Sequence, residues 1–350
     1  MTVHPARRPQ EAIARTTDRR VLIPVRIAPP PMALLRTLVV KEIGGETMGT
    51  TWSVRLAVPA GTDLPPLHDT IKQVLARIID EMSPWEPASN ITRFNNAPPG
   101  SWHHLPDGFY RVLAEGLRWA ERTDGAYDPT IGASVNLWGF GPERREPARA
   151  SPEAVDEARS RSGWQRVELD RASQRALQPG GLHIDLSSIA KGFAVDQVAR
   201  ALRANGVANM LVEIGGELRG EGVKPDGTPW WVELERPPRA AGLPLTILAL
   251  AGLSVATSGD ERRYFEAGSQ RFAHTLDPRT GTPVAHSLIS VTVAAEECMT
   301  ADAAATALMV LGPEKGPGFA AEHGLAARFL SFDEGQAHEV LSPALAAMLD

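Results

Sequence analysis

Cysteine is almost missing from this chain of 350 residues. Because only Cys298 is present, an intrachain disulfide is impossible, and the composition argues against a thiolate metal site. Apolar runs long enough to span a bilayer are also absent from the sequence. The net charge of −6, with a pI near 5.9, argues against a nucleic-acid surface that covers the whole protein. These absences predict a soluble protein of enzyme size.

Several common catalytic motifs are absent as well. No G-x-G-x-x-G opens a helix, no G-x-x-x-x-G-K-[ST] occurs, and neither H-E-x-x-H nor G-x-S-x-G is present. Standard dinucleotide folds, P-loop NTPases, zincins and α/β-hydrolases are therefore disfavoured.

Residues 1–36 differ in composition from the rest of the chain. They contain seven arginines against Glu11 and Asp18, and Pro24 and Pro29–Pro31 interrupt regular structure. The apolar stretch is too broken for a secretory signal, and no lipidation cysteine is seen. We expect 1–36 to be a basic, proline-rich, disordered extension, or a start codon assigned too early. We expect a single folded domain over 37–350 and a cytoplasmic location.

Hydrophobic periodicity predicts an irregular mixture of helices and strands over the folded part. Apolar spacing predicts helices, and alternating or continuous apolar runs predict strands. The predicted helices are 67–82, 109–122, 152–162, 189–203 and 301–311, and the predicted strands include 183–186, 209–214, 230–234, 271–276 and 288–294. Residues 245–256 form a long apolar run. The pattern predicts hairpin turns between several of the strands, which favours an α+β fold over a regular βαβ repeat.

The segment from His183 to Asp196 contains the first candidate site. Ser187 or Ser188 is placed to cap the predicted helix, and Lys191 then falls in its first turn. The helix dipole disfavours a cation there, so the position suggests a bound anion such as phosphate. A solvated surface lysine is the alternative at this point.

Asp302 and Thr306 form the second candidate site. They are four residues apart on the predicted helix 301–311, which Thr300 would cap and Gly312 would end. They therefore share a face, and a carboxylate beside a hydroxyl suits Mg²⁺. Alternatively, the threonine bonds the preceding turn and the aspartate only interacts with the helix start.

Two further side chains could serve a ligand. His274 precedes a D-P-R-T-G turn and could act as a general base or stack on a ligand. Trp85 lies in a proline-rich loop and could stack on a planar group. A structural histidine and a core tryptophan are the alternatives.

The motifs taken together resemble a known family. They are, in order, Gly45-x-Thr47-Met48-Gly49-Thr50, Asp124-Gly125-Ala126-Tyr127-Asp128-Pro129-Thr130, Asp185-Leu186-x-x-Ile189-Ala190-Lys191-Gly192, Gly215-Gly216, Thr257-Ser258-Gly259-Asp260, His274-x-x-Asp277-Pro278-x-x-Gly281 and Asp302-Ala303-x-x-Thr306. Their order and spacing are similar to those of the FAD:protein FMN transferases, the ApbE family, over residues 45–316. Many members have D-L-G-G or D-L-G-A where this chain has Asp185-Leu186-Ser187-Ser188, and many are exported lipoproteins.

The resemblance implies a single α+β, ApbE-like (T-fold-like) domain with mixed or antiparallel sheets flanked by helices. It implies Mg²⁺-dependent transfer of FMN from FAD to a Ser or Thr hydroxyl of an acceptor flavoprotein, with release of AMP. The metal would be held by Asp302, Thr306 and the carbonyl of Ser188. His274, Lys191 and Asp277 would be catalytic. The FAD site would comprise Met48, Trp85, Ala126, Tyr127, Asp128, Asp185, Lys191, Ser258, His274 and Leu276.

Two rival functions stay open at this point. One is an FAD pyrophosphatase, in which water replaces the acceptor hydroxyl in the same site. The other is a flavin-binding protein that holds FAD without turnover. Neither rival, nor the transferase, calls for a nucleic acid or a transmembrane segment.

Overall fold

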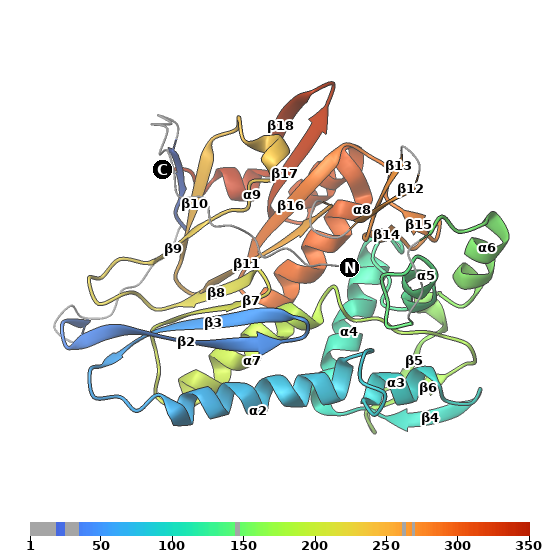
Figure 1. The fold of residues 1–350 in the computed structure, drawn as a ribbon, viewed down its shortest axis with the longest axis horizontal. Helices are drawn as coiled ribbons and strands as arrows, with labels where there is room; N and C mark the ends of the chain where they lie inside the picture. The colour runs from blue at the N-terminus through green and yellow to red at the C-terminus, as the bar shows by residue number, and fades with distance from the viewer. Residues whose placement is uncertain (1–18, 25–34, 144–147, 261–263, 268–269) are drawn as a thin grey trace.

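An eight-stranded sheet forms the centre of the fold (Figure 1). The computed structural model describes residues 19–24, 35–143, 148–260, 264–267 and 270–350. In spatial order the strands are β18 (Gln336–Leu341), β17 (Ala326–Asp333), β16 (Leu288–Ala295), β11 (Leu253–Gly259), β8 (Glu217–Glu221), β7 (Met210–Ile214), β3 (Thr50–Pro59) and β2 (Leu38–Thr47). Every neighbouring pair is antiparallel.

Four helices accompany this sheet, and they include the helices that carry the candidate site. They are α2 (Pro65–Met82), α4 (Asp107–Arg122), α7 (Ala190–Ala204) and α8 (Cys298–Glu322). α7 contacts β7 and β8, whereas α8 contacts β11 and β16. The apolar positions of α2, such as Leu67, Ile71 and Leu75, recur at helical spacing and are all buried in the main core. Six of the fourteen buried residues of α8 are alanine, and their small side chains let the helix lie close to its neighbours.

A smaller sheet and a second core accompany the large sheet. It consists of β1 (Arg19–Leu22), β10 (Leu245–Leu250) and β9 (Trp230–Glu233), with β1 parallel to β10. Leu22, Leu248 and Leu250 are fully buried in this second core. Ile23 N–H also donates to the Met348 carbonyl at 2.7 Å. The prediction of disorder is therefore wrong for Arg19–Leu22, while residues 1–18 and 25–34 lie outside the described residues.

The long apolar run 245–256 contains parts of two strands that belong to two different sheets. β10 ends at Leu250 and β11 begins at Leu253. Gly252 lies between them with φ +77°, a conformation that glycine adopts without strain. Hydrophobicity alone could not reveal this break, because both strands are buried.

The remaining elements are short, and most of them lie on the right-hand side of Figure 1. The helices are α3 (Asn90–Asn95), α5 (Gly132–Leu137), α6 (Pro152–Ser160), α9 (Pro343–Ala346) and the 3₁₀ turns Trp164–Arg166 and Pro238–Ala240. The strands are β4 (Ser101–His104), β5 (Glu168–Asp170), β6 (Arg175–Gln178), β12 (Tyr264–Ala267), β13 (Gln270–Ala273), β14 (Leu276–Asp277) and β15 (Thr282–Pro283). The observed fold confirms the predicted α+β class with mixed sheets flanked by helices.

Two predicted helix boundaries differ from the structure. The last predicted helix starts at Cys298 rather than Ala301, so Thr300 is not its cap. Gly312 breaks the helix as predicted, with φ +76° and ψ −177°, but a second helical segment follows directly. Pro313 allows this, because proline has a fixed helical φ and the first turn needs no N–H from it.

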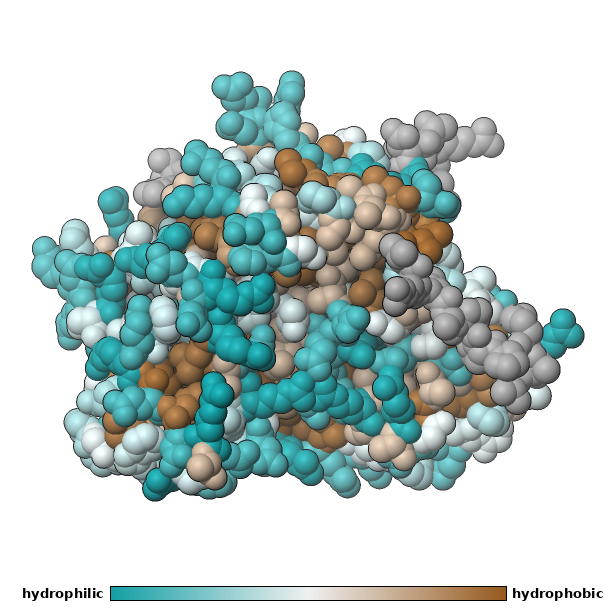
Figure 2. Space-filling view, turned by 180° about the vertical axis from the view of Figure 1, so that it is seen from behind, coloured by the Kyte–Doolittle hydropathy of each residue, from teal (hydrophilic) through white to brown (hydrophobic). Residues whose placement is uncertain are grey.

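The surface of the molecule is mostly hydrophilic on the face opposite to that of Figure 1 (Figure 2). Seen from behind, hydrophilic residues cover most of the face and apolar residues show as separate patches (Figure 2). No helix within the described ranges is long and apolar enough to cross a membrane.

Candidate active site

The N-terminal ends of α7 and α8 meet in backbone contact. Gly192 is the third residue of α7, and a Cβ added there would lie 2.3 Å from the carbonyl oxygen of Cys298. Only glycine permits this approach, since a methyl group would overlap the backbone of α8. The contact brings Lys191 of α7 and Asp302 of α8 into one buried region.

Lys191 is paired with a residue that the sequence did not single out. Its Nζ forms an ion pair and hydrogen bond with Oε1 of Glu217, the first residue of β8. The Lys191 side chain is still 31% exposed, whereas that of Glu217 is 3% exposed. The lysine can therefore reach a ligand, while the glutamate holds it from inside. The Gly215-Gly216 pair directly before Glu217 marked this position in the sequence. No sequence pattern, however, indicated that Glu217 would pair with Lys191.

The electrostatics of this pair depend on burial. Burial raises the pKa of Glu217 to about 7, although Lys191 works against the rise. Burial alone would lower the pKa of Lys191, but Asp302 and Glu217 outweigh it and hold that pKa above its ordinary value. Lys191 is therefore a permanent cation at neutral pH.

Asp302 lies on α8 and forms a hydrogen bond to the start of α7. It is buried, and its Oδ2 accepts the Gly192 N–H at 2.9 Å. In a regular helix start this N–H would bond the carbonyl four residues back, on Ser188. In the described part of the chain, no hydrogen bond reaches that Ser188 carbonyl. The carbonyl is thus available to a ligand, as the predicted metal site requires.

Thr306 and Ser258 complete what we term the polar cluster: Lys191, Glu217, Ser258, Asp302 and Thr306. Thr306 follows Asp302 by one turn of α8, and its Oγ1 lies 3.1 Å from Oγ of Ser258 on β11. Both hydroxyls are half-buried. The structure thus joins a predicted metal ligand to a predicted FAD residue.

The donor set of the polar cluster suits a hard cation. No group of three or more His, Cys, Asp or Glu side chains that could hold a metal occurs within the described residues, so softer sites are disfavoured there. Oε2 of Glu217 is buried without a hydrogen-bond partner, and two carboxylates face one ammonium group. Oxygen ligands with an excess of negative charge fit Mg²⁺.

The segment before α7 is not the strand that was predicted. His183 makes only an isolated bridge to Ile131, and Asp185 then turns the chain by accepting the Ser187 N–H at 2.8 Å. Neither serine caps α7, whose N-cap is Ile189 without a side-chain bond. Instead, Ser188 Oγ donates to the hydroxyl of Tyr127 at 3.0 Å.

The predicted FAD residues from Ala126 to Asp128 lie beneath the surface. Tyr127 is buried, and burial raises the pKa of its hydroxyl above the ordinary value. Asp128 accepts hydrogen bonds from the N–H and Oγ1 of Thr130 and from the Trp164 N–H. Burial also raises the pKa of Asp128. These contacts give the segment a supporting role behind Ser188.

His274, Leu276 and Asp277 belong to a different region. His274 meets Phe140 edge-on with ring centroids 6.2 Å apart, and Leu276 packs into the adjoining apolar cluster. We call the four rings of that cluster the aromatic wall: Trp138, Phe140, Phe265 and Phe272. Asp277 is engaged by Arg279 through Nε at 2.9 Å and Nη2 at 2.7 Å, so its carboxylate stabilises the turn.

Comparison with known proteins identifies the family. The ApbE family model matches residues 48–329. The chain is 38% identical to the FAD:protein FMN transferase of Haemophilus influenzae, over 87% of this chain and 90% of that protein. It is 33% identical to the Escherichia coli protein of the same name, over 91% and 92%. This chain belongs to the ApbE family.

Solved structures of other ApbE proteins have the same fold. The apo flavinyl transferase ApbE of Pseudomonas stutzeri superposes with a TM-score of 0.83 at 39% identity, over 89% of this chain and 97% of that one. The flavin transferase ApbE of Vibrio cholerae gives 0.81 at 32% identity, over 89% and 100%. These structures confirm the ApbE-like fold expected from the sequence.

Two predicted ApbE-site residues lie at turns and loops. Met48 has φ +49° in the two-residue turn between β2 and β3 and packs against the main core. Trp85 lies between α2 and α3 with 47% of its surface exposed, so it is not a core tryptophan, and its stacking on a ligand stays a prediction. Neither shares a hydrogen bond with the polar cluster.

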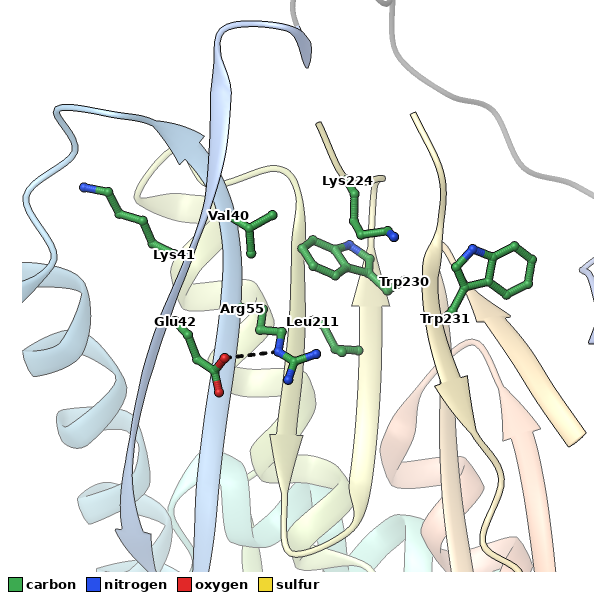
Figure 3. Close-up of a pocket in the computed structure, with 8 residues that line it drawn as sticks. All are labelled: Val40, Lys41, Glu42, Arg55, Leu211, Lys224, Trp230 and Trp231. Atoms are coloured by element: carbon green, nitrogen blue, oxygen red, sulfur yellow. Dashed lines mark hydrogen bonds and ion pairs between the residues drawn. The ribbon is translucent and has the colours of Figure 1, made fainter. Parts of the chain in front are cut away.

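A surface hollow of about 310 Å³ lies elsewhere on this ApbE-family chain (Figure 3). Trp230, Trp231 and Val40 line it, and the Glu42–Arg55 ion pair at 3.2 Å lies at its edge. None of the sequence-predicted site residues lines this hollow. The candidate site is therefore the polar cluster rather than this cavity.

Proposed function

We propose that this protein is a Mg²⁺-dependent FAD:protein FMN transferase that attaches FMN to a Ser or Thr hydroxyl of an acceptor flavoprotein and releases AMP. The single observation that carries the proposal is the polar cluster. Lys191 and Asp302 meet there at the start of α7, beside a carbonyl and two hydroxyls without a complete set of protein partners.

The anion partner of Lys191 would be the pyrophosphate of FAD. Lys191 stays charged, is partly exposed and lies in the first turn of α7. The positive dipole end of that turn favours phosphate oxygens. Glu217 fixes the ammonium group, so the charge is in place before the substrate arrives.

The metal ligands would be Asp302, Thr306 and the carbonyl of Ser188. Asp302 uses Oδ2 for Gly192, which leaves Oδ1 for the metal. When bound, Mg²⁺ would neutralise charge on the pyrophosphate oxygens. Few protein ligands are needed, because Mg²⁺ keeps waters and phosphate oxygens in its shell.

The transfer itself needs a nucleophile, a proton acceptor and a leaving group. The acceptor hydroxyl oxygen forms a bond to the phosphorus of the FMN half, and the bond from that phosphorus to the bridging oxygen breaks. AMP leaves with the bridging oxygen. His274 would take the hydroxyl proton, which contributes ~10²–10⁴-fold, and positioning contributes more.

A mass balance tests the proposal. The protein is incubated with FAD and Mg²⁺, with and without an acceptor flavoprotein, while AMP, free FMN and the acceptor mass are followed. AMP together with an acceptor heavier by one FMN residue supports the transferase. AMP with free FMN alone, across a panel of acceptors, favours the pyrophosphatase. Intact FAD under every condition favours the binding protein.

A further inference from the structure

The N-terminus of α8 has no cap from its own sequence. Its N-cap residue, Glu297, makes no side-chain hydrogen bond to the helix. Instead Asp196, from the middle of α7, accepts the Cys298 N–H at 3.0 Å through Oδ1 and the Met299 N–H at 2.9 Å through Oδ2. One carboxylate thus satisfies two of the free N–H groups of α8 and meets the positive end of its dipole.

The N-terminus of α7 is capped in the same way from the opposite side. Its own N-cap, Ile189, provides no side-chain bond, and the Gly192 N–H is satisfied by Asp302 of α8. The two helices therefore cap each other reciprocally, with Asp196 serving α8 and Asp302 serving α7. Asp302 is the carboxylate of the proposed metal site. The cap that Asp196 provides therefore fixes the start of α8, the helix that carries Asp302.

Asp196 is itself held by β8. It is 2% exposed, and its Oδ1 lies 2.8 Å from Nη1 of Arg219. Arg219 follows Glu217 by two positions on β8, so both side chains lie on the same face of the sheet. β8 thus anchors Lys191 through Glu217 and Asp196 through Arg219, and both anchors act on the polar cluster. Figure 1 shows β8, α7 and α8 meeting in this part of the fold.

We propose that Asp196 is a positioning residue, which by capping α8 places the Asp302 carboxylate against α7 and thereby sets the affinity of the metal site. It contacts neither the reacting atoms nor the proposed ligands, and acts only through the start of α8. The part of the proposal that concerns metal affinity rests on the proposed function. The part that concerns the placement of Asp302 is a statement about the protein alone.

Asp196→Asn is the informative variant, because it keeps the size of the side chain but leaves one oxygen to serve two N–H groups. Glu81→Gln is a matched control. Glu81 of α2 is a buried carboxylate whose Oε2 accepts the Phe109 N–H at 3.0 Å, near the start of α4. It thus also caps a helix from another segment of the chain, through one N–H rather than two, at a place outside the polar cluster.

Two measurements are made on each full-length variant. Amide hydrogen exchange without metal reports the Gly192 N–H, which only Asp302 protects. Calorimetric titration with MgCl₂ reports the metal affinity. For Asp196→Asn we expect exchange at Gly192 to be about tenfold faster and Mg²⁺ binding to be ~10–100-fold weaker. For Glu81→Gln we expect faster exchange at Phe109 and unchanged Mg²⁺ binding.

Unchanged exchange at Gly192 in a folded Asp196→Asn protein would overturn the proposal, as would unchanged Mg²⁺ affinity. If the wild-type protein neither binds Mg²⁺ nor releases AMP, the proposed function fails, while exchange at Gly192 still decides whether Asp196 places Asp302. Should Asp196→Asn not fold, Arg219→Lys loosens the same carboxylate and should shift both measurements in the same direction by a smaller factor.

Discussion

The polar cluster and the aromatic wall are built in opposite ways. The five members of the polar cluster are placed by four elements: α7, α8, β8 and β11. The aromatic wall depends on the hairpin β12–β13 and the short helix α5, and its contacts are ring stacks such as Phe265 on Phe272 at 4.9 Å. The difference teaches where precision is needed. Phosphate chemistry requires charges fixed in advance, whereas the stacked rings provide an apolar surface with preferred ring geometry.

Asp302→Ala tests the polar cluster most severely. We expect the rate of AMP release from FAD to fall by about 10³-fold, because the change removes the carboxylate ligand and the cap on Gly192 together. The measurement is AMP release under saturating Mg²⁺, with Asp156→Ala, on the exposed face of α6, as the control. Metal-dependent cleavage at the wild-type rate would remove Asp302 from the metal site.

Lys191→Met should have a slightly smaller effect. We expect a fall of about 10²–10³-fold in AMP release, because methionine fills similar space without the charge that faces the pyrophosphate. Lys224→Met is the matched control, since Lys224 pairs only with the exposed Asp226 at 3.8 Å. Equal losses in both variants would mean that overall charge, and not the site, is responsible.

His274→Ala tests the region beside the aromatic wall, where His274 contacts Phe140. We expect FMN transfer to fall by ~10²-fold through loss of the proposed base, while Mg²⁺ affinity stays unchanged. This pattern would sharpen the contrast, since one region would then hold the metal and the other would handle the acceptor proton. Full transfer activity from pH 6 to 9 would exclude His274 as the base, and weakened Mg²⁺ binding would mean that the two regions are not separate.

The smallest expected effect concerns stability and pH. Burial raises the pKa of Glu217 from 4.5 to about 7, so between these values the folded protein binds a proton that the unfolded chain has released. The free energy of unfolding should therefore fall as pH rises from about 4.5 to about 7. Urea unfolding with EDTA at several pH values measures this slope. Glu217→Gln should flatten it, whereas the exposed Glu157→Gln should not; an unchanged slope in Glu217→Gln would contradict the assignment.

Local patterns predicted the local structure well. The helices at 67–82 and 109–122 were predicted because their apolar spacing is complete within one segment. The predictions of a phosphate site at Lys191 and of a metal site at Asp302 and Thr306 rested on single helices in the same way, and they stay predictions. The ApbE resemblance added the order of motifs along the chain, which no single motif could give.

What the sequence could not predict are partnerships between distant segments. Glu217 pairs with Lys191 because β8 packs against α7. The Ser188 hydroxyl donates a hydrogen bond to Tyr127 and does not cap the start of α7. Strand β1 was missed for the same reason, since its partner lies more than 200 residues away at Leu245. Periodicity carries no information about such pairs.

The pairing of β1 has a consequence for the order in which the chain can be completed. Arg19 lies beside Leu245, Ile23 bonds to Met348, and the Asp350 N–H donates to the Val21 carbonyl. Strand β1 can therefore complete these contacts only after residues 245–248 and 348–350 have been synthesised. At ~5–20 residues per second, that delay lasts on the order of tens of seconds. The closure of so long a loop makes β1 a late element of folding.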